Sequence, residues 1–248
     1  FLKKYKPWGV ILFSRNIKSI EQTKKLTNEI KTIFKDNNYP ILIDQEGGKV
    51  NRLKKIINLD TLTSRFFGKL FEKNKKKFNI FYKVYIEKTS HLLKFIGSNI
   101  NTVPVLDIMK KNKSSIIGNR SFSNILFTIN EVGNYCIKLF HSYNIGTVIK
   151  HIPGHGEAKV DSHKFTPVVK KSLSYLLKND FSVFKNKKSF FAMTAHIIYQ
   201  NIDKKNTATH SKKVINLIRK KIKFKNIWIS DDISMKSLKY SIAENTKK

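Results

Sequence analysis

Short apolar runs alternate with longer amphipathic stretches along the whole chain. The runs are apolar at consecutive positions rather than at every second position, which is typical of strands buried on both faces of a parallel sheet. Six runs predict strands: 8–13, 41–43, 102–106, 146–150, 190–194 and 227–230. This pattern favours an α/β protein over a half-exposed antiparallel sheet.

The stretches between these runs have the period of amphipathic helices. Ser19 followed by Gln22 is a capping-box pattern, which predicts that a helix begins there. Its apolar face is expected to hold Leu26, Ile30, Ile33 and Phe34. Further helices are expected at about 79–94, 124–142, 173–178 and 211–222. The helix at 124–142 is expected to turn inward its apolar residues Ile125, Ile129, Val132, Cys136 and Phe140.

Chemically reactive side chains follow the ends of the predicted strands. They are Asp44 and Glu46, Asp107, Lys150 with His151, His196, and Asp231 with Asp232. In a (β/α)8 barrel this is the position of the active-site rim. A doubly wound sheet has its site at the same edge, but no glycine-rich dinucleotide motif follows the first strand. With no internal repeat or linker tract, the sequence predicts an α/β fold of the (β/α)8 TIM type, as one domain over residues 1–248.

The charge balance says little about a partner. Lysine and arginine number 49 against 17 acidic residues, a net charge of +32, but only five of the basic residues are arginine. Nucleic-acid-binding surfaces usually also use arginine, whose guanidinium group binds phosphate and guanine through two hydrogen bonds. We therefore interpret the excess as compositional bias and expect no specific nucleic-acid partner. A binder of nucleic acid or another anionic surface stays an alternative, which requires lysines on one face and salt-sensitive binding.

Length and hydropathy exclude several other classes of protein. The chain has 248 residues, 40% of them hydrophobic, which is enough for a core and excludes wholesale disorder. The apolar runs are far shorter than the ~20 residues of a membrane helix, so no membrane span is expected. Cys136 has no second cysteine with which to form an internal disulfide.

The segment 150–163 concentrates more chemistry than any other. It holds three of the seven histidines, two carboxylates and a tight turn containing Pro153. Asp161 and His163 are two positions apart and can meet as a carboxylate–imidazole pair, which serves as a general acid and then as a base. Two alternatives remain. The histidines could be structural and only form hydrogen bonds within the loop, or the three histidines His151, His155 and His163 could form a zinc site.

Two further segments place carboxylates directly after strands. Only one of Asp231 and Asp232 is expected to face a pocket, while the other caps the following helix, and spacing alone leaves the choice open. A pocket carboxylate opposite a general acid is the arrangement of glycoside hydrolysis. Earlier in the chain, two glycines between Asp44 and Arg52 allow a turn that brings these two side chains near one place.

Taken together, these motifs resemble glycoside hydrolase family 3, and within it the short, single-domain bacterial β-N-acetylglucosaminidases of peptidoglycan recycling. The matching segments run in order nearly from end to end: GVILFSRN (9–16), IDQEGGKVNR (43–52), NTVPVLDI (101–108), IGNRSF (117–122), KHIPGHG…DSH (150–163), MTAH (193–196) and SDDISM (230–235).

The resemblance implies a role for each matching residue. Asp231 is the expected nucleophile, His163 the acid/base and Asp161 its support. The expected sugar-binding residues are Asp44, Arg52, Arg120, Lys150 and His151. The implied activity is a retaining exo-β-N-acetylglucosaminidase that acts on cell-wall fragments as a cytoplasmic monomer, with a small carbohydrate substrate and without cofactor or metal. Another β-glycosidase of the family, or a phosphorolytic N-acetylglucosaminidase, is the alternative.

The resemblance also predicts an incomplete barrel. The first predicted strand matches what looks like the second strand of the family's barrel, and the chain ends before the last expected strand. We therefore expect about six of eight strands, with one missing at each end.

Overall fold

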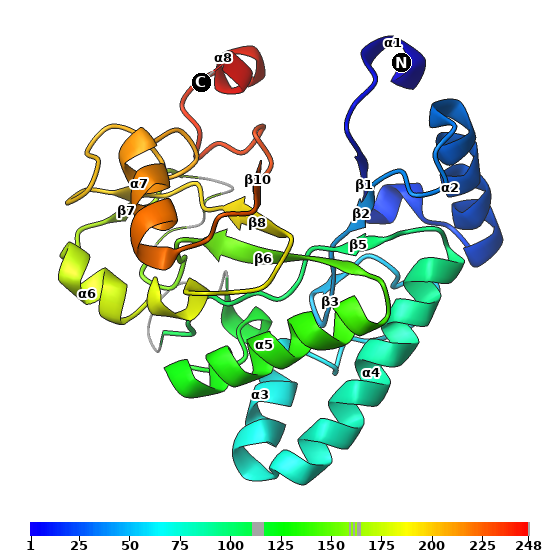
Figure 1. Cartoon of the computed structure of the whole chain (residues 1–248), viewed down its shortest axis with the longest axis horizontal. Helices are drawn as coiled ribbons and strands as arrows, with labels where there is room; N and C mark the ends of the chain where they lie inside the picture. The colour runs from blue at the N-terminus through cyan, green and yellow to red at the C-terminus, as the bar shows by residue number, and fades with distance from the viewer. Residues whose placement is uncertain (111–116, 159, 161, 163–164, 248) are drawn as a thin grey trace.

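The computed structural model describes residues 1–110, 117–158, 160, 162 and 165–247. Six parallel strands form one curled sheet in the order β1-β2-β5-β6-β8-β10 (Figure 1). Their bounds are β1 Val10–Leu12, β2 Ile41–Ile43, β5 Ile100–Asn101, β6 Gly146–Ile152, β8 Phe191–Thr194 and β10 Ile227–Ser230. Neighbouring strands in this sheet follow one another along the chain, as in a TIM-type barrel. The predicted α/β class and the incomplete, six-stranded barrel are therefore confirmed.

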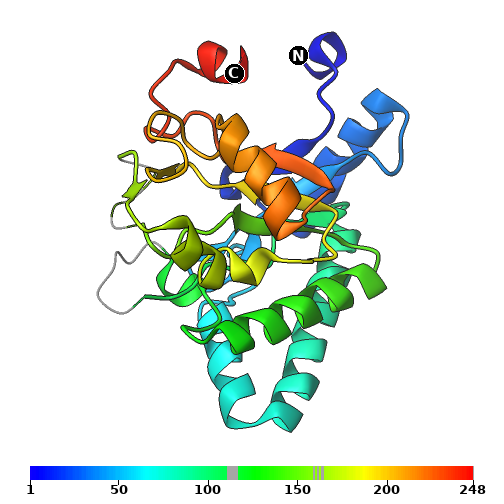
Figure 2. The same cartoon turned by 60° about the vertical axis from the view of Figure 1, so that its left-hand side comes forward.

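Helices connect and cover the strands. Their bounds are α1 Leu2–Tyr5, α2 Ile20–Phe34, α3 Ser64–Lys73, α4 Lys75–Phe95, α5 Leu126–Ser142, α6 Leu173–Lys178, α7 Lys212–Leu217 and α8 Ile242–Lys247. The short elements are the hairpin β3 Gln45–Gly47 and β4 Val50–Asn51, the pair β7 Val168–Val169 and β9 Ile198–Tyr199, the 3-10 turns η1 Ser14–Asn16, η2 Gly118–Arg120 and η3 Ser182–Phe184, and the π-helical turn η4 Ile218–Ile222. Helices α1 and α8 lie on the same side of the molecule, as Figures 1 and 2 show.

Helix α2 begins as the sequence predicts. The Ser19 hydroxyl accepts the backbone N–H of Gln22 at 3.2 Å, which satisfies one of the free donors of the first turn. Ile30 is buried, but Ile33 is 36% exposed, so its expected inward position is wrong. Ile125, which precedes α5, is likewise 50% exposed rather than buried. The periodicity of the sequence does not predict helix α3.

The strand expected at 102–106 is wrong in its position. The regular ladder is confined to Ile100 and Asn101. Beyond them the segment is joined to β6 by an isolated bridge between Val105 and Lys150 and by separate backbone hydrogen bonds. Pro104 has no N–H donor, so this segment cannot continue a regular ladder.

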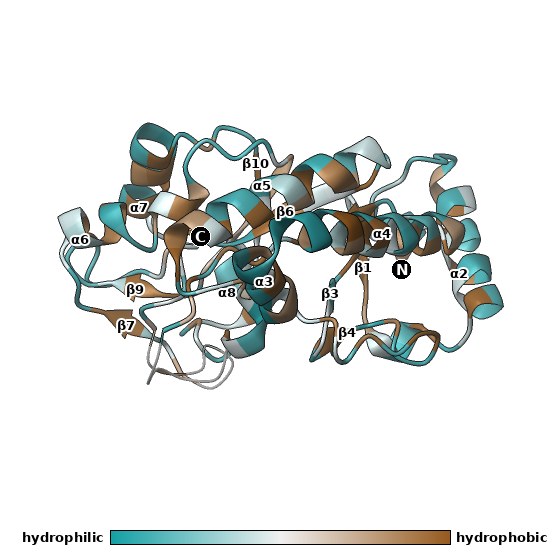
Figure 3. Ribbon diagram, turned by 90° about the horizontal axis from the view of Figure 1, so that it is seen from below, coloured by the Kyte–Doolittle hydropathy of each residue, from teal (hydrophilic) through white to brown (hydrophobic). Residues whose placement is uncertain are grey.

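Apolar side chains fill both faces of the sheet. On the concave face, β2, β5, β6 and β8 contribute the buried cluster Leu42, Ile100, Val148, Phe191 and Met193, against which Ile229 of β10 packs. The other face packs against the helices, where alternate residues such as Ile43, Ile149 and Ala192 are fully buried. In Figure 3 the helices carry both hydrophilic and hydrophobic positions, as expected for elements with one buried face. None of the helices in the described ranges is long and apolar enough to span a membrane.

A matched pair of isoleucines tests this core. Ile137 of α5 is 3% exposed and Ile80 of α4 is 64% exposed, and both lie within helices. We expect Ile137→Ala to lower the free energy of unfolding by roughly 2–5 kcal/mol, because it removes buried methyl groups and leaves a cavity. Ile80→Ala is the control and should change the free energy of unfolding by no more than roughly 0.5 kcal/mol. Urea denaturation measures both, and equal losses would contradict the assigned burial.

Candidate active site

A cavity of about 700 Å³ lies at the carboxyl ends of the parallel strands. Its lining includes the five expected sugar-binding side chains and the expected nucleophile: Asp44, Arg52, Arg120, Lys150, His151 and Asp231. Lys150 and His151 are consecutive, and residues of a regular strand alternate between faces. Both reach the cavity where the register of β6 against β8 shifts between Lys150 and Ile152. The structure thus brings these six side chains into one place.

Asp44, directly after β2, is held by three donors. Arg52 Nη2 lies 2.9 Å from Oδ2, Lys150 Nζ lies 3.1 Å from Oδ1, and the Thr102 hydroxyl also donates to Oδ1. The β3–β4 hairpin returns Arg52 to this place, as the sequence predicts. Gly47 in this hairpin has φ +85°, and a Cβ there would lie 2.3 Å from the Leu62 carbonyl oxygen. Burial by itself raises the pKa of Asp44, but Lys150, Thr102 and Arg52 outweigh it and hold that pKa well below its usual value.

Glu46 joins two of the expected sugar-binding cations. Arg120 approaches it with two hydrogen bonds, Nε to Oε2 at 2.8 Å and Nη2 to Oε1 at 2.9 Å, and Lys150 Nζ lies 2.6 Å from Oε1. Burial raises the pKa of Glu46, but attraction to Arg120 and Lys150 is stronger and lowers that pKa to about 2. The sequence identified Glu46 only as a polar residue at a strand end and gave it no role. The feature of the sequence that could have indicated a role for Glu46 is its place in the same motif as Asp44.

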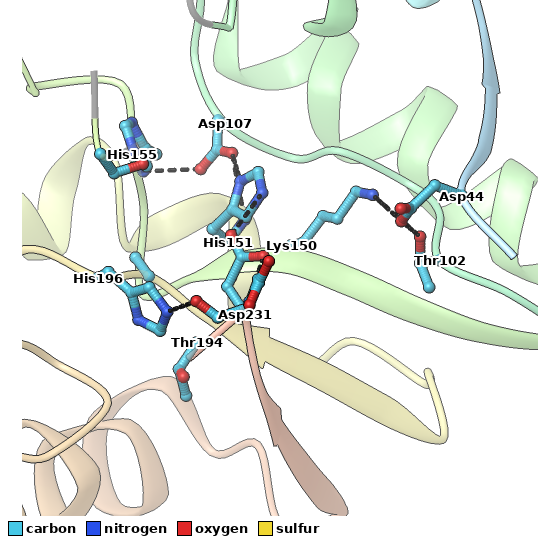
Figure 4. A network of polar contacts seen from close by, with 12 residues as sticks. Asp44, Thr102, Asp107, Lys150, His151, His155, Thr194, His196 and Asp231 are labelled. Carbon is cyan, nitrogen blue, oxygen red and sulfur yellow. Dashed lines mark hydrogen bonds and ion pairs between the residues drawn. The ribbon is translucent and has the colours of Figure 1, made fainter. Parts of the chain in front are cut away.

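Lys150 is therefore a buried cation shared by two carboxylates, as Figure 4 shows for Asp44. Burial lowers the pKa of Lys150, but Asp44 and Glu46 raise it above its usual value, so the ammonium stays charged. Ionised groups that are fixed in this way make strong, directional hydrogen bonds. Such a set of donors and acceptors suits a ligand that carries several hydroxyl groups.

His151 lies between two carboxylates. Its Nδ1 is 2.6 Å from Asp107 Oδ2, and its Nε2 is 3.8 Å from Asp231 Oδ2 (Figure 4). Asp107 is buried behind the ring and does not line the cavity. The sequence placed Asp107 at a strand end without assigning it a function.

The two consecutive carboxylates after β10 have different hydrogen-bond partners. Asp231 has its Oδ2 toward His151, and its Oδ1 accepts the N–H of Asp232 at 2.8 Å. Burial raises the pKa of Asp231, but His151, His196 and the Asp232 N–H outweigh it and lower that pKa, so the carboxylate is ionised. Asp232 instead accepts from the Ser234 N–H at 2.8 Å and the Ser234 hydroxyl at 2.6 Å. It caps a turn rather than the expected helix, since α8 begins only at Ile242.

His196 supports the backbone of this turn. Its Nε2 lies 3.1 Å from the Asp232 carbonyl oxygen, and its Nδ1 lies 2.7 Å from the Thr209 hydroxyl. Burial lowers the pKa of His196, which favours a neutral ring that donates from Nε2 and accepts at Nδ1. The ring thereby fixes the turn that carries Asp231.

Asp161 and His163, the expected acid/base pair, lie outside the described residues, so this assignment stays a prediction. The same holds for the zinc alternative, which needs His163. Of its other two histidines, His151 already engages Asp107 through Nδ1, and His155 Nε2 lies 3.3 Å from the Ser162 hydroxyl. Among the residues that the structure covers, no group of three or more His, Cys, Asp or Glu is arranged to hold a metal ion.

The fold and the cavity define a TIM-type barrel domain with ionised side chains at the carboxyl ends of its strands. Residues 1–247 match the sequence model of the glycosyl hydrolase family 3 N-terminal domain. The chain therefore belongs to this family.

Named relatives support the same grouping. The chain is 30% identical over 233 residues to a β-hexosaminidase of Methylobacillus flagellatus, covering 92% of this chain and 65% of the relative. It is 31% identical to a β-hexosaminidase of Psychromonas ingrahamii, covering 92% of this chain and 67% of that protein. The chain thus spans about two thirds of the length of these curated relatives.

Solved structures share the fold. A family 3 β-N-acetylglucosaminidase from Paenibacillus sp. str. FPU-7 superposes with a TM-score of 0.88 at 26% identity, covering 99% of this chain and 47% of the other. NagZ from Neisseria gonorrhoeae, in complex with N-trifluoroacetyl-D-glucosamine, gives 0.85 at 28% identity, covering 97% and 70%.

Replacing Glu46 tests the buried charge network. Glu46→Gln leaves Arg120 and Lys150 without one of their carboxylates, so we expect a loss of roughly 3 kcal/mol in unfolding free energy at pH 7. The pKa of Glu46 is depressed in the folded state, from 4.5 to about 2. Its stabilisation is therefore fully present above pH 4.5 and is lost as the pH falls through about 2.

Urea denaturation as a function of pH measures this effect. The difference between wild type and Glu46→Gln should narrow from pH 4.5 downward, because protonated glutamate and glutamine are alike in charge. Glu29→Gln, at an exposed position of α2, is the control and should show little difference at any pH. If the difference in unfolding free energy between wild type and Glu46→Gln did not depend on pH, this result would contradict the assigned ion pairs.

Proposed function

We propose that the protein is a retaining exo-β-N-acetylglucosaminidase. The observation that carries the proposal is the position of Asp231. It is an ionised carboxylate in one cavity with five side chains suited to binding sugar hydroxyls: Asp44, Arg52, Arg120, Lys150 and His151. The names of the relatives, β-hexosaminidases and N-acetylglucosaminidases, support N-acetylglucosamine as the sugar.

In the proposed reaction Asp231 attacks the anomeric carbon of the bound sugar while the bond to the leaving oxygen breaks. The His163 imidazolium gives its proton to that oxygen, and Asp161 holds the ring. The sugar is then an ester of Asp231. Neutral His163 takes a proton from water, which attacks the same carbon and regenerates the Asp231 carboxylate. Two displacements at one carbon retain the β configuration.

The floor of the cavity supports cleavage at a chain end. The side chains of Lys150 and Glu46 are 3% and 1% exposed, and that of Asp44 is 12% exposed. These groups lie deep in the cavity, and we propose that the hydroxyl groups of a terminal sugar residue reach them there.

We extend the proposal to the natural substrate on the resemblance alone. Cell-wall fragments with terminal N-acetylglucosamine are the proposed substrates, and the protein is proposed to act on them in the cytoplasm as a monomer without cofactor. Water is the proposed acceptor, so product analysis should detect free N-acetylglucosamine, and not its 1-phosphate, with or without phosphate present.

Replacing the nucleophile gives the first test. Asp231→Ala should lower kcat on an aryl β-N-acetylglucosaminide by roughly 1,000-fold or more, because the covalent step is lost. Sodium azide should restore turnover of this variant, since the small anion fits the space of the missing carboxylate, and the product should be the α-linked glycosyl azide. Asp36→Ala, which removes an exposed carboxylate, is the control and should leave kcat unchanged. Near wild-type turnover of Asp231→Ala would exclude it as the nucleophile.

The acid/base role of His163 predicts a dependence on the leaving group. His163→Ala should slow substrates with poor leaving groups, such as alkyl glycosides, far more than activated nitrophenyl glycosides, because only the former need protonation. Steady-state kcat/KM for both substrate types measures the difference. An equal loss on both would argue for a purely structural histidine.

A further inference from the structure

We propose that Asp107 is a positioning residue that fixes both the tautomer and the orientation of His151, so that His151 presents Nε2 to the cavity beside Asp231. The inference rests on the proposed function for its catalytic consequence only. The tautomer and orientation of the His151 ring concern residues that the structure describes, and they have a test that does not depend on the activity.

Three donors converge on the two oxygens of this one carboxylate. Oδ2 lies 2.6 Å from His151 Nδ1 and accepts the His151 backbone N–H at 3.1 Å. Oδ1 accepts the His155 backbone N–H at 2.6 Å. The Asp107 side chain has no exposed surface. The His151 ring and the backbone of the loop at His151 and His155 therefore all donate hydrogen bonds to one buried carboxylate.

The segment that carries Asp107 is itself fixed to β6. The Leu106 N–H donates to the Lys150 carbonyl oxygen at 2.9 Å, and Val105 forms a bridge with Lys150. Asp107 thus approaches His151 from a backbone that is already paired with the residue before it. This leaves little freedom in the distance between the carboxylate and the ring.

The tautomer follows from the charge of Asp107. Burial raises the pKa of Asp107, but His151 and His155 outweigh it and bring that pKa below its usual value. An ionised carboxylate only accepts hydrogen bonds, so Nδ1 of His151 must carry a proton. The ring atom left for the cavity is Nε2, which lies 3.8 Å from Asp231 Oδ2. Asp107 does not itself line the cavity, so it acts through the ring.

The substitution Asp107→Asn would reverse this arrangement. The oxygen of the new amide is expected at the place of Oδ1, because the His155 N–H lies only 2.6 Å away and needs an acceptor there. The amide NH₂ then faces Nδ1 of His151, and the His151 backbone N–H, at the longer distance of 3.1 Å, loses its acceptor. A donor at that place favours an unprotonated Nδ1 and moves the ring proton to Nε2. The change is isosteric, so it alters the ring without opening a cavity.

The direct test is the ring ¹⁵N spectrum of protein labelled with [¹⁵N]histidine. The His151 signals are assigned by their absence in His151→Ala. We expect a proton on Nδ1 of His151 in the wild type and its loss at neutral pH in Asp107→Asn. The matched control is Asp180→Asn, since Asp180 is also buried and packs against Gly154 of the same loop. It should leave the His151 signals unchanged.

Kinetics then separate positioning from general support of the loop. Asp107→Asn should lower kcat/KM roughly 100-fold, the scale of a misplaced group at a reacting centre. In the His151→Ala background the same change should cost less than about threefold, because the ring through which Asp107 acts is gone. A full 100-fold loss in that background would overturn the proposal and assign Asp107 to the loop backbone.

The outcomes distinguish this inference from the proposed function. An Nδ1 without a proton in the wild type overturns the positioning role, and this result does not require the variant to fold. A wild-type protein that releases no N-acetylglucosamine but has the expected His151 tautomer contradicts the proposed function and leaves the positioning role intact.

Discussion

The burial of the Lys150 ammonium group is the constraint on which the site depends. Removing a cation from water costs several kcal/mol unless partners replace the lost hydration. Here Asp44 follows β2 and Thr102 follows β5, while Lys150 itself belongs to β6. Glu46 lies 2.6 Å from the same ammonium. One cation therefore ties together the ends of three neighbouring strands, and it fixes the two carboxylates that in turn hold Arg52 and Arg120.

This arrangement explains why a lysine-rich chain can keep a defined site. Exposed lysines interact weakly with their surroundings, so their number can rise with little effect on the fold. A buried carboxylate is different, because its loss leaves its cationic partners unpaired. Few acidic residues remain in the chain, 17 of 248. Asp44, Glu46, Asp107 and Asp231 are among them, and each contacts a cationic or histidine partner in the site. The acidic residues are thus more informative about function than the net charge.

The fold and the residue types of the site could be predicted from the sequence, but the pairings could not. Apolar runs place the strands, and strand ends place Asp44, Lys150 and Asp231 at one edge. The contact between Lys150 and Asp44 joins residues 106 positions apart, and no local pattern encodes it. The roles of Glu46 and Asp107 depend on such contacts and were missed. The strand expected at 102–106 failed for a local reason, the missing donor of Pro104.

In the proposed mechanism the charge beside His151 changes during the reaction. Asp231 is a carboxylate before the first displacement and a neutral ester after it, so the ring loses one of its two acidic neighbours while the covalent intermediate exists. Asp107 is buried, takes no part in bond formation and keeps its charge throughout. A ring held only by the nucleophile would be released in the middle of the cycle. A ring held from behind by Asp107 keeps Nε2 directed at the sugar in both half-reactions, and this is the physical reason to place a buried carboxylate there.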